Sequence, residues 1–229
     1  MKKITAALLL AGLFGAVSAQ ASVVEFNAAK ALTTTNWSDT LSFGKFDTKL
    51  GTLTSIKFEL NGTVAGSGRA ESLDSAASNV TLTLGSLLTL QRPDGSTLVV
   101  ANPVFSTGYN FSAFDGGIDF AGTSGASTGQ VSNSGSNAFT SFSANDFAAF
   151  SAAGGGNIDL NLRADGASTG SGSGNLITQF NTAAAGDVKV VYEYTAAAPV
   201  PEPETYGMLL LGMGVLGLAR RRANKNKAA

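Results

Sequence analysis

Residues 56–62 read Ile-Lys-Phe-Glu-Leu-Asn-Gly, and this alternation of apolar and polar side chains decides the fold class of the chain. Successive side chains of a β-strand point to opposite faces, so every second residue here would meet a core while the others meet water. The Asn61-Gly62 pair favours a two-residue hairpin turn, because both residues tolerate positive φ angles. The segment therefore predicts a half-buried antiparallel strand that ends in a hairpin.

The same period of two recurs along the chain, in residues 80–84, 158–162 and 188–194. Residues 92–96 read Arg-Pro-Asp-Gly-Ser, a turn in which Pro presets φ and Gly accepts a positive φ, so they should link two further strands. Many short strands with Gly-rich turns predict an all-β fold, namely an antiparallel β-sandwich of jelly-roll-like topology.

Three further segments of the body have other compositions. Residues 122–137 and 165–175 are so rich in Gly, Ser and Thr that we expect two long exposed loops there. Residues 146–150 are compatible with one short helical turn, whereas helical periodicity is otherwise nearly absent before Thr205.

The chain contains neither Cys nor His. Disulfides, thiolate zinc sites and Cys nucleophiles are therefore excluded, and so are the commonest general base and every Ser-His-Asp triad. Any two of the ten aspartates could serve a glycosidase, but their spacing selects no pair. We expect no enzymatic activity and no cofactor.

Charge is distributed unevenly along the chain. Residues 22–198 hold eight Lys and Arg against 14 acidic residues, a net charge of −6, and the other basic residues lie near the two ends. An acidic body repels phosphate backbones, so we expect no binding to nucleic acid.

The N-terminus has the organisation of a secretory signal peptide. Lys2 and Lys3 form a positive region, residues 4–17 are apolar, and Ala19 and Ala21 place small residues at the positions that signal peptidase reads. Cleavage after Ala21 would leave Ser22 as the new N-terminus.

The C-terminus combines a Pro-rich segment, an apolar run and a basic cluster. Pro201 and Pro203 prevent a helix before Thr205, and residues 206–219 are apolar on all sides. A helix of this length spans about 21 Å, less than the hydrocarbon core of about 30 Å, although flanking arginines can snorkel and lengthen it. The positive-inside rule places these arginines in the cytoplasm and the body outside, as the signal peptide also predicts.

This order of elements resembles the PEP-CTERM sorting signal, the substrate of the transpeptidase-like membrane exosortases of Gram-negative bacteria. The resemblance maps the recognition motif onto Pro201, Glu202 and Pro203, and the short transmembrane helix onto residues 206–219. It maps the stop-transfer cluster onto Arg220, Arg221 and Arg222. It implies a transient hold in the inner membrane, followed by delivery to the cell surface or the extracellular matrix.

Residues 43–56 read Phe-Gly-Lys-Phe-Asp-Thr-Lys-Leu-Gly-Thr-Leu-Thr-Ser-Ile. They resemble the opening of the choice-of-anchor β domains that precede such sorting tails, type E in particular, with Ile56 in place of a Val. That family has no established enzymatic activity, which agrees with the missing chemistry.

Two sets of residues in the body are candidates for a binding site. Asp115 and Asp119 could offer carboxylates to Ca²⁺, but further close oxygen ligands are absent and turn residues between two strands are the better interpretation. Four aromatic residues could stack on sugars, although aromatics on strands more often pack in a core. They are Trp37, Tyr109, Tyr192 and Tyr194.

The sequence thus predicts a signal peptide at 1–21, a β-sandwich surface domain at 22–198 and a sorting signal at 199–229. The expected partners are signal peptidase, an exosortase-like transpeptidase, the membrane and, as one possibility, an exopolysaccharide. Two functions stay open. The first is a structural surface or matrix protein of biofilm or floc, and the second is a glycan-binding adhesin.

Overall fold

The computed structural model describes residues 21–172, 174–197, 210–218 and 220. Gln20–Ala196 form one compact unit, which we call the β domain, and the C-terminal segment belongs to a second unit. In that second unit, residues 210–218 are helical and their side chains are exposed. Within the described residues, no helix has the length and apolar character needed to cross a bilayer.

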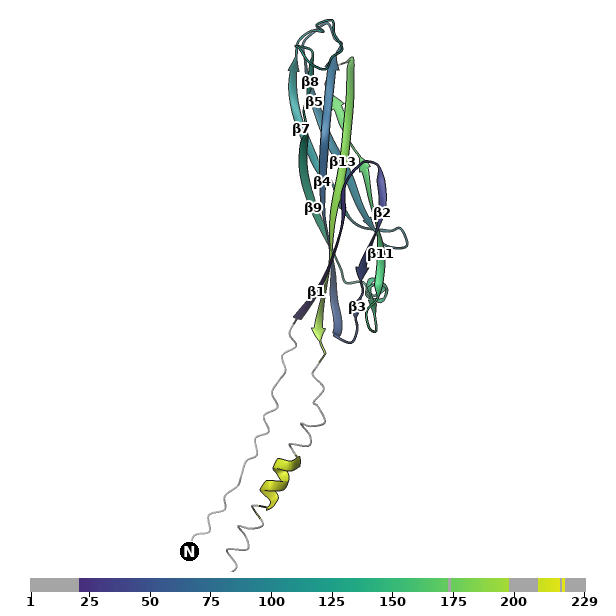
Figure 1. Cartoon of the computed structure of the whole chain (residues 1–229), viewed down its shortest axis with the longest axis vertical. Coiled ribbons are helices and arrows are strands. Elements are labelled where there is room, and N and C mark those ends of the chain that lie inside the picture. The colour runs from purple at the N-terminus through teal and green to yellow at the C-terminus, as the bar shows by residue number, and fades with distance from the viewer. Residues whose placement is uncertain (1–20, 173, 198–209, 219, 221–229) are drawn as a thin grey trace, which may run out of the picture. The chain divides into compact units, whose positions relative to one another are not determined.

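One sheet of the β domain has the strand order β1-β13-β4-β8, and β9 also pairs with β4 (Figure 1). All pairings in this sheet are antiparallel. Two of its strands are unusually long and run through most of the domain. The strands are β1 (Ala21–Thr34), β4 (Gly51–Ser72), β8 (Gly125–Ser127), β9 (Val131–Ser141) and β13 (Leu176–Ala196).

The second sheet has the order β12-β5-β11-β2, and β6 and β7 both pair with β5. Its strands are β2 (Trp37–Gly44), β5 (Ser78–Gln91), β6 (Thr97–Ala101), β7 (Val104–Phe111), β11 (Asn157–Gly166) and β12 (Thr169–Ser171). The short strands β3 (Phe46–Asp47) and β10 (Ser151–Ala152) form a separate parallel pair next to the helix α1 (Ala144–Phe150).

The longer strands pair in a nested order. β1 pairs with β13, β2 with β11, β4 with β9, and β5 with β7. A chain that pairs its first strand with its last and continues inward in this way is a long hairpin rolled across two sheets, which is the arrangement of a jelly roll. The predicted antiparallel β-sandwich of jelly-roll-like topology is confirmed.

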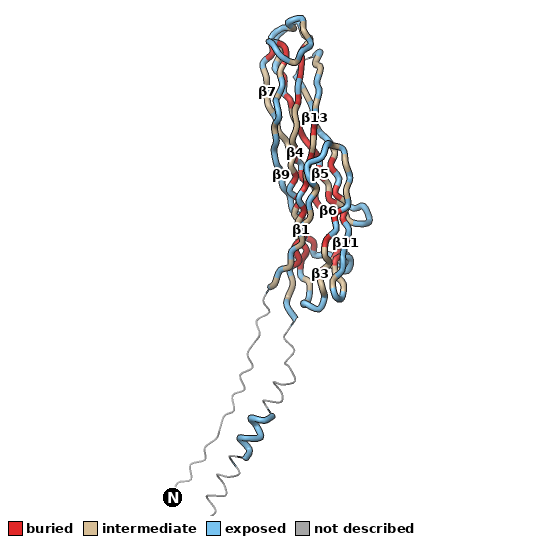
Figure 2. The backbone as a smooth tube through the Cα atoms, in the orientation of Figure 1, coloured by how far each residue is buried: buried red, intermediate tan, exposed pale blue. Residues whose placement is uncertain are grey.

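The interior of the β domain contains two hydrophobic clusters, visible as buried segments along the strands (Figure 2). We call the end where β1 begins and β13 ends the proximal end. The proximal core lies toward it and contains large buried side chains, among them Phe43, Phe46, Phe58, Phe150, Leu160 and Tyr192. The distal core is smaller and consists of Ala70, Val80, Leu82 and Phe111.

The hairpin predicted at Asn61-Gly62 is wrong, because β4 continues through both residues to Ser72. Gly62 instead pairs with Gly186 of β13 on one side and Gly135 of β9 on the other. A Cβ on Gly62 would lie 2.8 Å from Leu88 Cδ1, and one on Gly186 would lie 2.8 Å from Leu162 Cδ2. These glycines therefore provide a close approach between the sheets rather than a turn.

The long loop predicted at 122–137 is also wrong, because β8 and most of β9 lie within it. The second predicted loop, 165–175, is partly wrong, since β11 extends to Gly166 and β12 occupies Thr169–Ser171. Composition did not reveal β9 because its side chains are mostly polar and exposed. Its polar residues have a structural role: Asn133 Nδ2 donates to the Val104 carbonyl at 2.5 Å, and Asn137 Nδ2 donates to the Val100 carbonyl at 2.9 Å.

The turn at residues 92–96 and the short helix near 146–150 are both confirmed. The Arg92 amide donates to the Ser96 carbonyl at 2.8 Å, and the turn joins β5 to β6. The guanidinium of Arg92 also holds Asp146 of α1, with Nε–Oδ1 and Nη2–Oδ2 distances of 2.7 and 2.9 Å. This two-point ion pair fixes the helix against the turn and lowers the pKa of Asp146.

Candidate functional site

Asp115 and Asp119 lie in the loop between β7 and β8, which we call the distal loop (residues 112–124). The carboxylate of Asp115 accepts hydrogen bonds from the amides of Gly117 and Thr123, and Asp119 accepts one from the amide of Ala121. The Gly117 amide is the main cause that lowers the pKa of Asp115. Both carboxylates thus shape the loop, and the described residues contain no group of three or more acidic side chains that could hold a metal ion.

A buried carboxylate fastens the distal loop to the sheet. Glu71, near the end of β4, is 0 % exposed. Its Oε2 accepts from the Phe120 amide at 2.7 Å and its Oε1 accepts from the Ser124 hydroxyl at 2.6 Å. Both oxygens of the buried group are satisfied by the loop, so breaking either hydrogen bond would leave a charged group poorly solvated.

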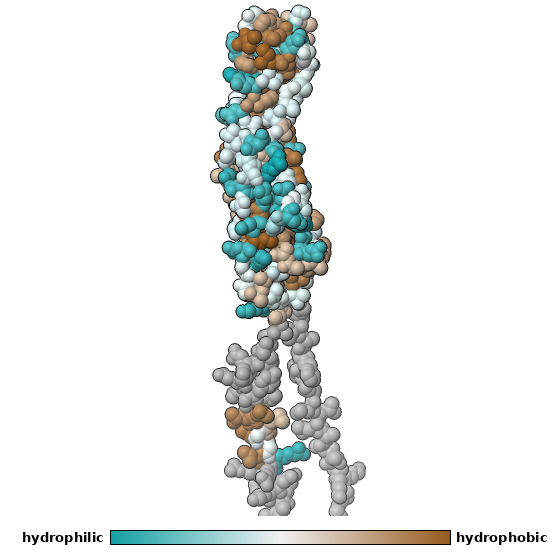
Figure 3. All heavy atoms as spheres, turned by 90° about the vertical axis from the view of Figure 1, so that its right-hand side faces the viewer, coloured by the Kyte–Doolittle hydropathy of each residue, from teal (hydrophilic) through white to brown (hydrophobic). Residues whose placement is uncertain are grey.

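Sequence reasoning missed Glu71, because a single acidic residue at the end of a strand carries no local signal of burial. It also missed the loop's apolar surface. Ile118 is 57 % exposed, and Phe114 and Phe120 are partly exposed. Figure 3 shows hydrophobic side chains gathered at the distal end of the β domain.

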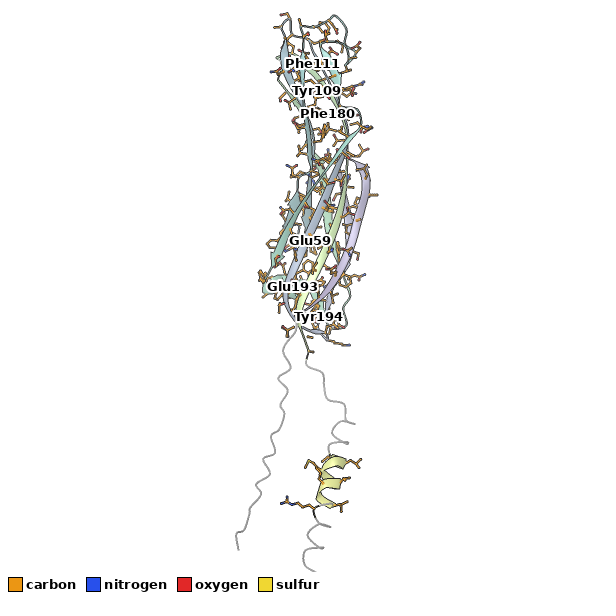
Figure 4. All side chains as sticks on the ribbon, turned by 90° about the vertical axis from the view of Figure 1, so that its left-hand side faces the viewer. Glu59, Tyr109, Phe111, Phe180, Glu193 and Tyr194 are labelled. Atoms are coloured by element: carbon orange, nitrogen blue, oxygen red, sulfur yellow. The ribbon has the colours of Figure 1, made fainter. Side chains whose placement is uncertain are left out.

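The four aromatic residues considered for sugar stacking do not share one face. Tyr192 is 0 % exposed, belongs to the proximal core and donates from its hydroxyl to the Gly44 carbonyl at 2.9 Å. Burial raises its pKa above the usual value. Tyr194 packs on Phe46 with ring centroids 5.0 Å apart, while Tyr109 lies in the distal half of the domain (Figure 4).

Trp37, the fourth of these aromatics, lies on β2 and packs against the proximal core. The Lys30 ammonium is 6.0 Å from the centre of its ring and forms a 2.8 Å ion pair with Asp39. Trp37 is thus a core-edge residue beside a charged pair and not part of an aromatic platform.

A hollow of about 440 Å³ lies on the outer face of the first sheet. Polar side chains from three neighbouring strands line it. Asn27 comes from β1, Glu59 and Asn61 from β4, and Asp187 and Lys189 from β13. Figure 4 shows Glu59 midway along the domain.

Most residues that the sequence marks for processing lie outside the described part of the chain. These residues are Ala19, Pro201, Glu202, Pro203, Arg221 and Arg222. Two processing residues are described. Ala21 is the first residue of β1, and Arg220 is helical and exposed.

The two ends of the β domain lie side by side. Ala21 pairs with Thr195 and Ser22 pairs with Tyr194, so β1 begins where β13 ends. The end of β13 is well held, because the Ser55 hydroxyl donates to the Glu193 carboxylate at 2.8 Å and the Thr54 hydroxyl donates to the Glu193 carbonyl at 2.9 Å. Glu193 and Tyr194 mark this end in Figure 4. Removal of the first 21 residues would therefore leave almost all of β1 in place.

Residues 199–223 match the model of the PEP-CTERM protein-sorting motif. The motif begins just after β13 ends at Ala196. It marks a protein of Gram-negative bacteria that is exported, passes the membrane and is sorted by an exosortase.

Several solved structures are remote likenesses of this chain. No match was found among curated proteins. Among solved structures, the VP2 subviral particle of infectious bursal disease virus is 11 % identical, with a TM-score of 0.22 over 78 % of this chain and 37 % of that chain. The semi-empty virus-like particle of the giant freshwater prawn Macrobrachium rosenbergii nodavirus is 10 % identical, with a TM-score of 0.20 over 87 % of this chain and 96 % of that chain.

The structure of the Gx strain of infectious bursal disease virus is 13 % identical to this chain, with a TM-score of 0.16. The aligned region covers 84 % of this chain and 47 % of the viral one. The chain thus spans less than half the length of the bursal disease virus proteins that it matches. The PEP-CTERM motif therefore provides the functional information, and the β domain must be interpreted from its own residues.

Proposed function

We propose that the chain is a non-enzymatic surface or extracellular-matrix protein, sorted through its PEP-CTERM motif and used in exopolysaccharide-associated assembly such as biofilm or floc. The observation that carries the proposal is the position of the motif at residues 199–223, directly after a complete β-sandwich whose last strand ends at Ala196. A folded β domain that is followed directly by a sorting motif is suited to transfer to a surface acceptor.

The absence of catalysis is part of the proposal. It is supported by the lack of His and Cys in the sequence and by the structural use of the buried carboxylates. Asp146 is held by Arg92, and Glu71 is held by the distal loop. Neither carboxylate is free to act as a general acid or base.

We further propose that the β domain is of the choice-of-anchor E type. Its support is the segment at residues 43–56, which runs from the end of β2 through β3 into β4. Phe43, Phe46 and Ile56 are at most 2 % exposed, so the resembling residues build the proximal core.

In the proposed route, signal peptidase cuts after Ala21 and an exosortase-like transpeptidase acts near Pro201, Glu202 and Pro203. The residues before each proline are restricted to extended conformations, which keeps this segment out of a helix and accessible to the enzyme. The short apolar run behind it holds the chain in the inner membrane only until transfer, because an undersized span is a weak anchor.

Replacement of Pro201, Glu202 and Pro203 by alanine tests this route. The variant should accumulate at full length in the inner-membrane fraction, as should the wild type in a host that lacks its exosortase. A matched control replaces Asn224, Lys225 and Asn226, which lie beyond the motif, and it should be sorted normally. Surface delivery of the first variant with an unchanged C-terminal mass would refute the proposal.

A glycan-binding adhesin is the second candidate, and the polar hollow on the outer face of the first sheet favours it. Amide, carboxylate and ammonium groups from three strands converge there and could bind sugar hydroxyls. A glycan array probed with the full-length chain in a non-ionic detergent tests the idea. Micromolar binding that Asn61→Ala removes would support it, and binding to no glycan would leave only the structural role.

A further inference from the structure

Arg69 is an exposed cation to which the described residues offer no carboxylate partner, in a domain with an acidic net charge. The described ion pairs of the β domain use Lys30, Lys57, Arg92, Arg163 and Lys189. Arg69 lies on β4 between β13 and β8, opposite Gln179 and Ser127. Its guanidinium is thus placed in the middle of a paired sheet rather than at a free edge.

Two contacts hold this guanidinium in a fixed orientation. Its Nε donates a 2.6 Å hydrogen bond to Gln179 Oε1, and its Cζ lies 4.4 Å from the centre of the Phe120 ring. The described residues provide no acceptor for its two terminal NH2 groups. A guanidinium can bind a carboxylate through these two groups by two parallel hydrogen bonds.

Phe120 is itself held in an unfavourable backbone conformation. Its φ angle is 59°, the left-handed region that a bulky residue rarely adopts. The buried carboxylate of Glu71 stabilises this conformation by accepting the Phe120 amide hydrogen bond at 2.7 Å. Strain of this kind, about 1 to 3 kcal/mol, persists where the surroundings enforce it and is concentrated at binding sites.

A polar hollow of about 290 Å³ lies beside the guanidinium. Its remaining lining consists of hydroxyl and amide side chains, from Ser67, Ser127, Gln179 and Asn181, together with Phe180. Hydroxyls and amides both donate and accept hydrogen bonds, as sugar hydroxyls do. Phe180 lies in the distal half of the domain (Figure 4), and its ring packs against the distal core.

We propose that Arg69 and this hollow form a binding site for the carboxylate of an acidic saccharide, a uronic acid within a polysaccharide. The guanidinium binds the carboxylate, and the hydroxyl and amide side chains bind the neighbouring sugar hydroxyls. A peptide is a poorer fit, because β4 is paired on both sides near Arg69 and offers no edge for strand addition. This site deepens the adhesin alternative above and does not depend on the sorting route.

The test uses the full-length chain in a non-ionic detergent and short oligogalacturonates as the probe, with calorimetry as the readout. The wild type should bind the oligogalacturonate at least tenfold more tightly than the same oligosaccharide with methyl-esterified carboxyls. Arg69→Gln should reduce the affinity at least tenfold, and Arg69→Lys should fall between the two, because it keeps the charge but loses the Gln179 contact.

Arg163→Gln is the matched control, since Arg163 is another exposed arginine of the β domain and lines neither of the two hollows described above, and its binding should equal that of the wild type. Thermal unfolding of each variant separates loss of binding from loss of fold. The proposal is overturned if the wild type does not bind, if Arg69→Gln binds unchanged, or if esters or acidic peptides bind equally well. These outcomes leave the sorting proposal untouched, because that proposal is tested by C-terminal mass in cells.

Discussion

The proximal and distal parts of the β domain are stabilised in different ways although the same two strands, β4 and β13, run through both. The proximal core is thick and aromatic, with Phe46, Phe58 and Tyr192 almost completely buried. The distal core contains four buried hydrophobic residues among those described, and hydrogen bonds from the distal loop to Glu71 lie beside it. Burial of apolar area therefore provides most of the stability of the proximal part. Hydrogen bonding to the buried Glu71 carboxylate provides a larger share of the stability in the distal part than in the proximal part.

This difference matches the division of tasks that we propose. The proximal end holds the start of β1 and the end of β13, so in the proposed route it has to stay folded while the chain is cut and transferred. The distal end carries the strained Phe120 and the exposed guanidinium of Arg69, features that are suited to contact with a ligand. Each part can be perturbed separately.

The largest expected effect is in the proximal core. Phe58→Ala removes a ring that is 0 % exposed and lies 5.0 Å from the ring of Phe150, so the unfolding free energy should fall by about 3 to 5 kcal/mol. The loss of unfolding free energy in Phe111→Ala, in the distal core, should be at least about 1 kcal/mol smaller than in Phe58→Ala, because removal of a ring from this small cluster leaves a smaller cavity. Urea unfolding of both variants checks this, and equal losses would contradict the comparison.

The ion pair between Arg92 and Asp146 gives the next effect. The Asp146→Asn variant should be less stable than the wild type by about 2 to 3 kcal/mol at neutral pH. The substitution weakens charge-assisted hydrogen bonds of a side chain that is only 6 % exposed. Arg92 lowers the pKa of Asp146 from 3.8, so the stabilisation is complete above pH of about 4 and is lost as pH falls through the lowered pKa.

The difference in stability between wild type and Asp146→Asn should accordingly shrink below pH of about 4. The exposed Asp159→Asn serves as the control and should behave like the wild type at all pH values. A difference that stays constant down to the acid transition would show that the ion pair does not provide this stability.

Glu71→Gln tests the distal attachment. The glutamine side chain would place its NH2 group opposite either the Phe120 amide or the Ser124 hydroxyl, so one of the two hydrogen bonds is lost. The unfolding free energy should fall by about 1.5 to 3 kcal/mol. Hydrogen exchange at the Phe120 amide should become faster while amides of the proximal core stay protected. Glu25→Gln, at an exposed position, should change neither region, and uniform acceleration in the Glu71 variant would argue against a local attachment.

Substitution of Gly62, where the two sheets lie close together, has the smallest expected effect on stability. Gly62→Ala places a methyl group against Leu88 and should cost about 1 to 2 kcal/mol. Because the two side chains compete for one space, the double variant with Leu88→Ala should lose less stability than the sum of the single variants. Additive losses would mean that Gly62 is needed for its backbone conformation, as in the hairpin that the sequence suggested.

These positions show how far the sequence could predict the fold. Alternation at residues 56–60 and 158–162 located strands correctly, because a sheet with one buried face imposes that period on its residues. The prediction at Asn61-Gly62 was wrong because a glycine suits a turn and a close approach of two sheets equally well. Only the spatial neighbours of Gly62, which are Gly186 and Leu88, decide between the two. The polar strand β9 was missed because its hydrogen-bonding partners are distant in the sequence.

The functional residues divide in a similar way. The sorting motif was predictable because its elements are contiguous and ordered along the chain. The proposed Arg69 site was not predictable, because it combines residues of β4, β8, β13 and the distal loop that only folding brings together. The aromatic residues singled out from the sequence were a poor guide, since Tyr192 is fully buried in the core.

The most direct test of the central claim is the intact mass of the protein recovered from the cell surface. The proposed signal-peptide cleavage predicts a chain that begins at Ser22. Delivery through the PEP-CTERM motif predicts that it ends near Pro201 to Pro203, without the apolar run and the arginines behind it. A surface-located chain whose mass includes Arg220, Arg221 and Arg222 would contradict the account.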